Sequence, residues 1–196
     1  MASLLADRTL PDLLSAFAAA VPTPGGGSAC AAASAIGAAL LMKAASIAGV
    51  PQDSLVGIEA QLVDAIDGDA RAFGDVMAAR KQPRDTQAER TLRTTAIQLA
   101  LRHATDVPLS IMRLSAEALT EAHSLAPRIH RSTIADVTVA VILLRAGFEG
   151  ARTTVVANLG GLADLQHAAT VRDECGRLSE QAERGSGGAE QLLRVV

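Results

Sequence analysis

Aromatic side chains are nearly absent from this chain of 196 residues, which has three phenylalanines and no tryptophan or tyrosine. Hydrophobic residues still make up 49% of the sequence, so the apolar content is mainly alanine, leucine, valine and isoleucine. Aromatic and β-branched residues favour β-sandwiches, whereas small and straight-chain apolar residues favour closely packed helices. The composition therefore predicts an all-α protein, and the length suits a single domain over residues 1–196.

The sequence also lacks the features of nucleic-acid-binding and membrane proteins. Its formal net charge is -3, whereas nucleic-acid-binding domains present basic surfaces. Only Phe17, Phe73 and Phe148 are available to stack on bases. The most apolar run, from Ala29 to Met42, contains Ser34 and is shorter than the roughly 18 residues of a membrane span. We therefore expect a soluble protein with no nucleic-acid partner and no membrane association.

Cysteine and histidine are few and dispersed. Cys30 and Cys175 form no Cys-x-x-Cys pair, which favours reduced, structural thiols and a cytoplasmic protein. Met1 to Asp7 shows no basic region followed by an apolar stretch, so no secretory segment is expected. No two histidines share a helical face, and we expect no metal site. The histidines are His103, His123, His130 and His167.

Proline and glycine breaks divide the chain into five or six helices. Apolar residues recur at helical spacing between these breaks, as in Ile58, Leu62 and Ile66, and no segment shows the alternation of a strand. We expect Pro108 to kink or divide the fourth helix, and Gly185-Ser186-Gly187-Gly188 to loosen the chain after the sixth. The predicted helices run from Thr9 to near Val21, from the glycine-rich loop to about Ala48, from Asp53 to Ala79, from Thr86 to Ser124, from Ser132 or Thr133 to Leu159, and from Leu162 to Glu183.

The sharpest local motif is Pro22-Thr23-Pro24-Gly25-Gly26-Gly27-Ser28, which leads directly into a helix. Its glycines leave the approach free of side chains, and the first helical turn offers unpaired N–H groups at the positive end of the dipole. This combination suits a carboxylate, a phosphate or a polarised carbonyl. A tight connection between helices, with Ser28 as a cap, is the alternative. No Gly-Lys-Ser/Thr sequence follows, so the motif is not a P-loop.

Three other polar features have two interpretations each. Asp136 stands before an apolar helix and is either a general acid or base, or the acidic partner of Thr133 in a capping box. Asn158 is either a buried amide at a ligand or a residue of the helix end before Gly160-Gly161. The basic residues Arg80, Lys81 and Arg84 either receive an acidic ligand tail or form a solvated loop.

Four segments together resemble the formimidoyltetrahydrofolate cyclodeaminase and methenyltetrahydrofolate cyclohydrolase family. The similarity extends from roughly Leu10 to Asp164, and the Pro-x-Pro-Gly-Gly-Gly-Ser string is its most specific part. The resemblance implies an all-α bundle of long, mostly antiparallel helices, usually a homodimer, that acts on a one-carbon unit carried by tetrahydrofolate. The segments are Pro22 to Ser28; Asp69-Ala70-Arg71-Ala72-Phe73 with Val76-Met77-Ala78-Ala79; Val107-Pro108-Leu109; and Asp136 with Val155 and Asn158-Leu159.

The resemblance also implies a substrate and a set of site residues. The substrate is a tetrahydrofolate derivative, and no tightly bound cofactor is implied. Cyclising a formimidoyl group requires that a proton leave N10 and that another reach the departing ammonia, whereas hydrolysing a methenyl bridge requires an activated water. One carboxylate can carry either proton transfer. By this resemblance Gly25, Gly26, Gly27 and Ser28 contact the ligand, Asp69 and the loop of Arg80, Lys81 and Arg84 lie nearby, Asp136 is the site carboxylate, and Asn158 lies beside it.

Several polar positions differ from the family pattern. The family has a Gly-Asn pair, then Asn, then Ser-Asp before the fifth helix; here these positions are Ile129-His130, Ser132 and Ala135-Asp136. Thr154 stands where a later Asn-Val pair begins. Three hypotheses follow. The first is a folate cyclodeaminase or cyclohydrolase. The second is a diverged enzyme of the same fold with another amidine-like or cyclised substrate, and the third is a non-catalytic helical binding or partner subunit.

Overall fold

Long helices account for most of the chain, as the composition predicts. The computed structural model describes residues 4–193. Both ends of the predicted domain over residues 1–196 lie outside this range, as do the first three residues of the segment Met1 to Asp7. Within it, no residue belongs to a strand. The elements are α1 (Leu10–Ala18), α2 (Gly26–Ile47), α3 (Asp53–Arg80), α4 (Gln87–Leu125), two 3₁₀ turns (Ala126–Arg128 and Arg131–Thr133), α5 (Ile134–Leu159) and α6 (Leu165–Leu193).

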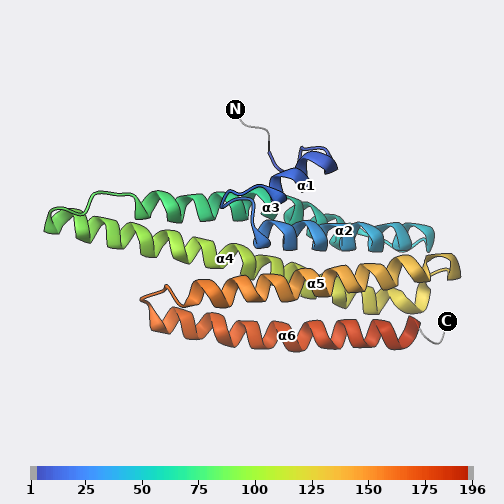
Figure 1. Ribbon diagram of the computed structural model, residues 1–196. Coiled ribbons are helices and arrows are strands. Elements are labelled where there is room, and N and C mark those ends of the chain that lie inside the picture. Colours follow the sequence, from blue (N-terminus) through green and yellow to red (C-terminus); the bar gives the residue numbers. More distant parts are fainter. Residues whose placement is uncertain (1–3, 194–196) are drawn as a thin grey trace.

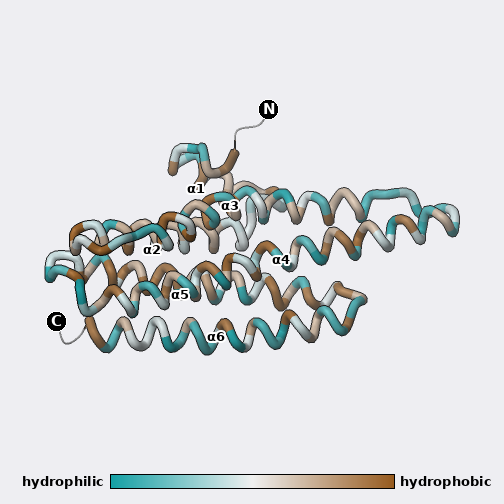
Figure 2. Tube along the Cα trace, turned by 180° about the vertical axis from the view of Figure 1, so that it is seen from behind, coloured by the Kyte–Doolittle hydropathy of each residue, from teal (hydrophilic) through white to brown (hydrophobic). Residues whose placement is uncertain are grey.

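Consecutive long helices run in opposite directions, so α2 to α6 form a bundle with mostly antiparallel neighbours (Figure 1). α4 lies against α3, α5 and α6, while α2 packs on α3 and α5. The short α1 lies across the outside of α3 (Figure 1). The end of α3 and the start of α4 extend beyond the other helices as a two-helix arm, and the loop at its tip is hydrophilic (Figure 2). The predicted all-α antiparallel bundle is confirmed.

Small residues let α2 and α5 approach closely along their length. A Cβ atom added to Gly147 would collide with Ser34, and one added to Gly150 would collide with the sulfur of Cys30. Ser34 also shares a buried hydrogen bond of 2.8 Å with Ser115 of α4, so its hydroxyl is satisfied in the core. The close packing of helices that the composition predicts is confirmed at this pair. By length and composition α2 is also apolar enough to cross a membrane, and 44% of its most apolar window is buried inside the bundle.

Helix starts follow the capping signals of the sequence. The Thr9 hydroxyl accepts a hydrogen bond from the Asp12 N–H at the start of α1. Thr86 and Glu89 form a capping box at the start of α4, with hydrogen bonds of 2.8 and 3.2 Å. Of the two outcomes expected at Pro108, a kink or a division, the division is excluded, because α4 continues through that residue to Leu125.

The predicted loosening of the chain at Gly185-Ser186-Gly187-Gly188 is wrong, since α6 continues through this segment to Leu193. The reason lies in packing against α4. A Cβ atom on Gly185 would meet the backbone of Leu119, and one on Gly188 would overlap the ring of His123. These glycines therefore permit close contact between two helices. The helical penalty of glycine, roughly 1 kcal/mol per residue in isolation, is outweighed by the burial this contact allows.

Candidate active site

A cavity of about 300 Å³ lies where the glycine-rich loop enters α2. Four parts of the chain form its walls: the loop itself, one face of α3, the middle of α4 and the last turns of α5. The cavity thus joins residues from both halves of the sequence. The polar groups and the one aromatic ring in its wall are Thr23, Asp69, Phe73, Arg80, Thr154 and Asn158.

Asp69 is the carboxylate in this wall. Its Oδ2 accepts hydrogen bonds from the backbone N–H of Ser28 at 2.9 Å and from the Ser28 hydroxyl at 3.3 Å. Ser28 lies in the first turn of α2, so the positive end of that helix faces the carboxylate. Burial raises the pKa of the Asp69 carboxyl above its ordinary value, and the two hydrogen bonds from Ser28 oppose part of that rise. A carboxyl fixed in orientation, with a raised pKa, is suited to proton transfer.

The α3 wall carries a stripe of four residues at helical spacing: Asp69, Phe73, Val76 and Arg80. At a rise of about 1.5 Å per residue, roughly 16 Å of helix separates the carboxylate end from the cationic end. Between them Phe73 is 39% exposed, which is unusual for an aromatic side chain in a chain with so few. The sequence shows that these four residues share one face of a helix. The same spacing is also typical of a helix whose apolar face, with Phe73, is buried in a core, so the sequence alone did not identify the cavity wall.

Asn158 and Thr154 reach the cavity from α5. The Asn158 amide donates a hydrogen bond of 2.6 Å to the carbonyl oxygen of Ala104, which also lines the cavity. The Thr154 hydroxyl donates to the carbonyl oxygen of Gly150 at 3.1 Å, within its own helix. Asn158 is therefore both a wall of the cavity and a link between α5 and α4.

Asp136 lies outside this cavity. It is in the first turn of α5 and forms an ion pair of 2.8 Å with Lys43 of α2. At about 1.5 Å per residue, roughly 33 Å of α5 separates it from Asn158, so the expectation that these residues lie side by side is wrong within one chain. The capping-box alternative is also wrong, because no side chain caps α5 and the Thr133 hydroxyl donates to the carbonyl of His130.

The other predicted ligand residues divide into two groups. Gly25, Gly26, Gly27, Asp69, Arg80 and Asn158 line the cavity together, and their role in ligand binding stays a prediction of the family resemblance. Ser28 is fully buried and does not line the cavity, and its N–H and hydroxyl both donate to Asp69. Lys81 caps the end of α3 and Arg84 lies exposed in the following loop, and neither lines the cavity.

Comparison with known proteins assigns the chain to a family. The sequence model described as formiminotransferase-cyclodeaminase matches residues 9–177. This chain belongs to that family.

Relatives within the family carry two different names. A methenyltetrahydrofolate cyclohydrolase of Methylorubrum extorquens is 33% identical, over 83% of this chain and 84% of its own length. A formimidoyltransferase-cyclodeaminase of Rattus norvegicus is 32% identical over 91% of this chain, which spans only 35% of that protein. A formiminotetrahydrofolate cyclodeaminase of Thermotoga maritima shares the fold, with a TM-score of 0.86 at 22% identity over 96% of this chain and 97% of its own.

The departures from the family pattern fall in two places. Thr154 lies in the wall of the cavity, so a hydroxyl stands where the family pattern places an amide. The other departures lie near the start of α5, at the end of the bundle that holds the Lys43–Asp136 ion pair; they are Ile129, His130, Ser132 and Ala135. Only one of the altered positions therefore changes the chemistry of the cavity.

Proposed function

We propose that this protein binds a tetrahydrofolate derivative in the cavity and transforms its one-carbon unit, with Asp69 as the proton-transfer group. The observation that carries this proposal is the convergence of a half-buried carboxylate, an exposed aromatic ring and a cation along one stripe of α3. The family relatives named for methenyl- and formimidoyl-folate chemistry support the same substrate class.

The order of groups along α3 corresponds to the order of groups in the ligand. A reduced folate consists of a pteridine, an aminobenzoyl ring and an anionic glutamate, and its one-carbon unit lies between the first two. With the one-carbon unit at Asp69, the aminobenzoyl ring lies on Phe73 and Val76 and the glutamate reaches Arg80. The pteridine then lies beneath Gly25 and Gly26, where no side chain obstructs it. Aromatic stacking and a carboxylate–guanidinium contact fix the ligand at both ends of the reacting group.

Methenyl hydrolysis is the first reaction to test, because the cyclohydrolase relative matches over most of both chains. The bridge carbon is already cationic and lacks only an activated water. Asp69 accepts a proton as the water oxygen bonds to that carbon, and then delivers one to the ring nitrogen as its bond to the carbon breaks. Formyl-tetrahydrofolate is the product, and one proton is released overall.

Formimidoyl cyclisation uses the same carboxyl in a different order. The formimidoyl group reacts as its protonated amidinium form. N10 forms a bond to the formimidoyl carbon and gives its proton to Asp69, which passes that proton to the departing amino group as the carbon–nitrogen bond breaks, so ammonia leaves and the cationic methenyl bridge remains. The raised pKa of Asp69 suits both reactions, because a carboxyl that titrates closer to neutrality takes up and returns a proton more readily. The relatives named cyclodeaminase make this the second reaction to test.

The decisive experiment follows the absorbance of methenyltetrahydrofolate with and without the purified protein. Faster loss of that absorbance supports hydrolysis, and its faster appearance from formimidoyl-tetrahydrofolate supports cyclisation. Asp69→Asn is the matched control, since it keeps the size of the side chain and an acceptor for Ser28. Failure of the unmodified protein to bind either folate or to change either rate contradicts the proposal, and favours a non-folate substrate or a non-catalytic subunit.

A homodimer in the cytoplasm is part of the same proposal. Ile36 and Ile47 on α2, and Val139 and Ile142 on α5, are large apolar side chains that the bundle leaves exposed. We propose that a second copy of the chain covers these side chains. Light scattering at micromolar concentration tests the homodimer, because a monomer would contradict it.

Both cysteines are free thiols, as expected of a protein in a reducing compartment such as the cytoplasm. Cell fractionation tests the proposed cytoplasmic location.

A further inference from the structure

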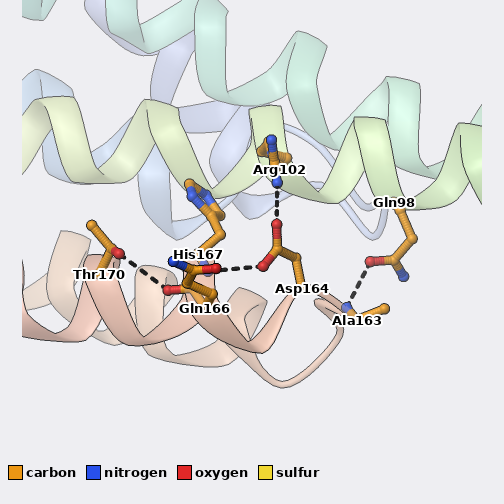
Figure 3. A network of polar contacts seen from close by, with 7 residues as sticks. All are labelled: Gln98, Arg102, Ala163, Asp164, Gln166, His167 and Thr170. Carbon is orange, nitrogen blue, oxygen red and sulfur yellow. Dashed lines mark hydrogen bonds and ion pairs between the residues drawn. The ribbon is translucent and has the colours of Figure 1, made fainter.

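The connection between α5 and α6 is held against α4 by one side-chain amide. Gln98 donates from Nε2 to the carbonyl oxygen of Gly161 at 3.0 Å, and its Oε1 accepts from the N–H of Ala163 at 2.7 Å. Figure 3 shows Gln98 extending from α4 to this loop. Among side chains of this length, only an amide both donates and accepts, so neither glutamate nor methionine can replace both contacts.

A second contact ties the same loop to the start of α6. Arg102, one turn after Gln98 on α4, forms an ion pair of 2.6 Å with Asp164 (Figure 3). The other oxygen of Asp164 accepts from the N–H of His167 at 2.9 Å and so caps α6. The five-residue connection between Leu159 and Leu165 is therefore fixed to α4 on both sides of Leu162.

The loop touches the wall of the cavity. A Cβ atom on Gly161 would come within 3.0 Å of Leu101, so the loop backbone lies directly against that side chain. Leu101 lines the cavity, as does Asn158, which lies just before the loop and binds Ala104. The position of the loop therefore affects the positions of two residues in the cavity wall, Leu101 of α4 and Asn158 of α5.

We infer that Gln98 is a positioning residue for the cavity, acting through Asn158 and Leu101 without contacting the ligand itself. This inference rests on the proposed function of the cavity. Without the two hydrogen bonds of Gln98, Gly161 and Ala163 gain freedom, and the last turn of α5 moves away from α4. Displacements of about 1 Å in a binding wall are enough to reduce turnover strongly.

The test compares Gln98→Met, which loses both hydrogen bonds, with Gln98→Glu, which keeps only an acceptor for Ala163. We expect kcat/KM to fall about tenfold in Gln98→Met and less in Gln98→Glu. Hydrogen exchange at the Ala163 amide should be faster in Gln98→Met and change less in Gln98→Glu, which keeps an acceptor for that N–H. Arg113→Met is the matched control. It removes a similar link, the Arg113–Glu174 ion pair between α4 and α6, roughly 14 Å beyond Ala104 on α4, and should leave kcat/KM unchanged.

A double-mutant cycle separates positioning from general destabilisation. If Gln98 acts through Asn158, the effect of Gln98→Met on kcat/KM should largely disappear when Asn158→Ala is already present. Should Asn158→Ala not fold, the same cycle is measured with Pro108→Ala added to every variant. Alanine at position 108 restores a backbone N–H for the Ala104 carbonyl, which Asn158 otherwise satisfies. Fully additive effects, or an equal loss in Arg113→Met, would overturn the inference. An unmodified protein without folate binding or turnover would instead contradict the proposed function, while the exchange rate at Ala163 would still report whether Gln98 holds the loop.

Discussion

Asn158 supplies a hydrogen bond that Pro108 cannot. Proline at position 108 has no N–H to donate to the carbonyl of Ala104 four residues earlier, and the Asn158 amide from α5 donates to that carbonyl at 2.6 Å. This contact explains how α4 continues through a proline in a buried part of the bundle. It also ties the last turns of α5 to the wall of the cavity.

The first prediction concerns this pair. Asn158→Ala should destabilise the protein by about 1–3 kcal/mol, because the Ala104 carbonyl then lacks a partner. Pro108→Ala restores a backbone N–H at position 108 and should reduce the cost of Asn158→Ala to less than about half. Urea unfolding of the two single variants and the double variant measures this. Equal costs with and without Pro108 would show that the contact does not compensate for the proline.

The second prediction concerns the glycine-rich loop. Gly27 faces Asp69 so closely that an added Cβ atom would overlap the carboxylate, whereas an added Cβ on Gly26 meets nothing within 4 Å. Gly27→Ala should therefore cost about 1–3 kcal/mol and displace Asp69, while Gly26→Ala should leave the melting temperature unchanged or slightly higher. Thermal unfolding distinguishes them. Equal losses would indicate that the loop needs glycine for its backbone conformation instead of for space.

The third prediction concerns catalysis by Asp69. Asp69→Asn should reduce turnover of the folate substrate by about 10² to 10⁴, because an amide does not transfer protons at neutral pH. Circular dichroism should show the helix content unchanged, since the asparagine oxygen still accepts from Ser28. Turnover within a factor of two of the unmodified protein would exclude Asp69 as the proton-transfer group.

The same substitution makes a prediction about stability and pH. Burial penalises the charged form of the Asp69 carboxyl only in the folded chain, which raises the folded pKa above the unfolded one. Asp69 therefore lowers stability at neutral pH, and this cost fades as the pH falls through the raised pKa towards the ordinary value. Asp69→Asn should melt higher than the unmodified protein at neutral pH, with a gap that narrows in acid. A gap independent of pH would contradict this linkage.

The fourth prediction concerns Arg80 and the ligand's tail. Arg80→Gln should weaken binding of a reduced folate about tenfold. Binding of a second ligand, the same reduced folate without its glutamate, should change little, because that ligand has no tail for Arg80 to contact. Arg71→Gln is the control, because Arg71 is also an exposed arginine of α3 but does not line the cavity. Equal weakening for both ligands would show that Arg80 acts on the fold or on the pteridine end. Calorimetric titration of both ligands measures the difference.

The fifth prediction concerns Asp136. Its partner Lys43 is 57% exposed, and exposed ion pairs contribute about 1 kcal/mol or less. Asp136→Asn should therefore change unfolding stability by no more than that amount, and turnover should stay within about twofold. A loss of turnover comparable to that of Asp69→Asn would restore the role that the family resemblance implied for Asp136, with the carboxylate supplied to the cavity of a second copy of the chain.

Local chemistry in the sequence was enough to predict where α1, α2 and α4 begin, although the capping box considered for Thr133 and Asp136 does not form. The capping box of Thr86 and Glu89, the cap at Thr9 and the glycine-rich entry to α2 each depend on residues a few positions apart. Backbone hydrogen bonds and side-chain caps are made within a turn or two, so short-range patterns identify them. The scarcity of aromatic residues likewise predicted an all-α bundle of close-packed helices, because helices of alanine and glycine can approach one another at short range.

The tertiary structure alone decided which residues share a site and which glycines end a helix. Asp136 and Asn158 belong to one helix, but its length places them at opposite ends, while Asp69 reaches the glycine loop from a different helix. Gly185 and Gly188 read as a break because their helical propensity is poor, yet packing against Leu119 and His123 outweighs that cost. The separation of Asp136 from Asn158 follows from the length of α5. The contact of Asp69 with Ser28 and the contacts of Gly185 and Gly188 join residues more than 40 positions apart, and no local pattern encodes their free energy.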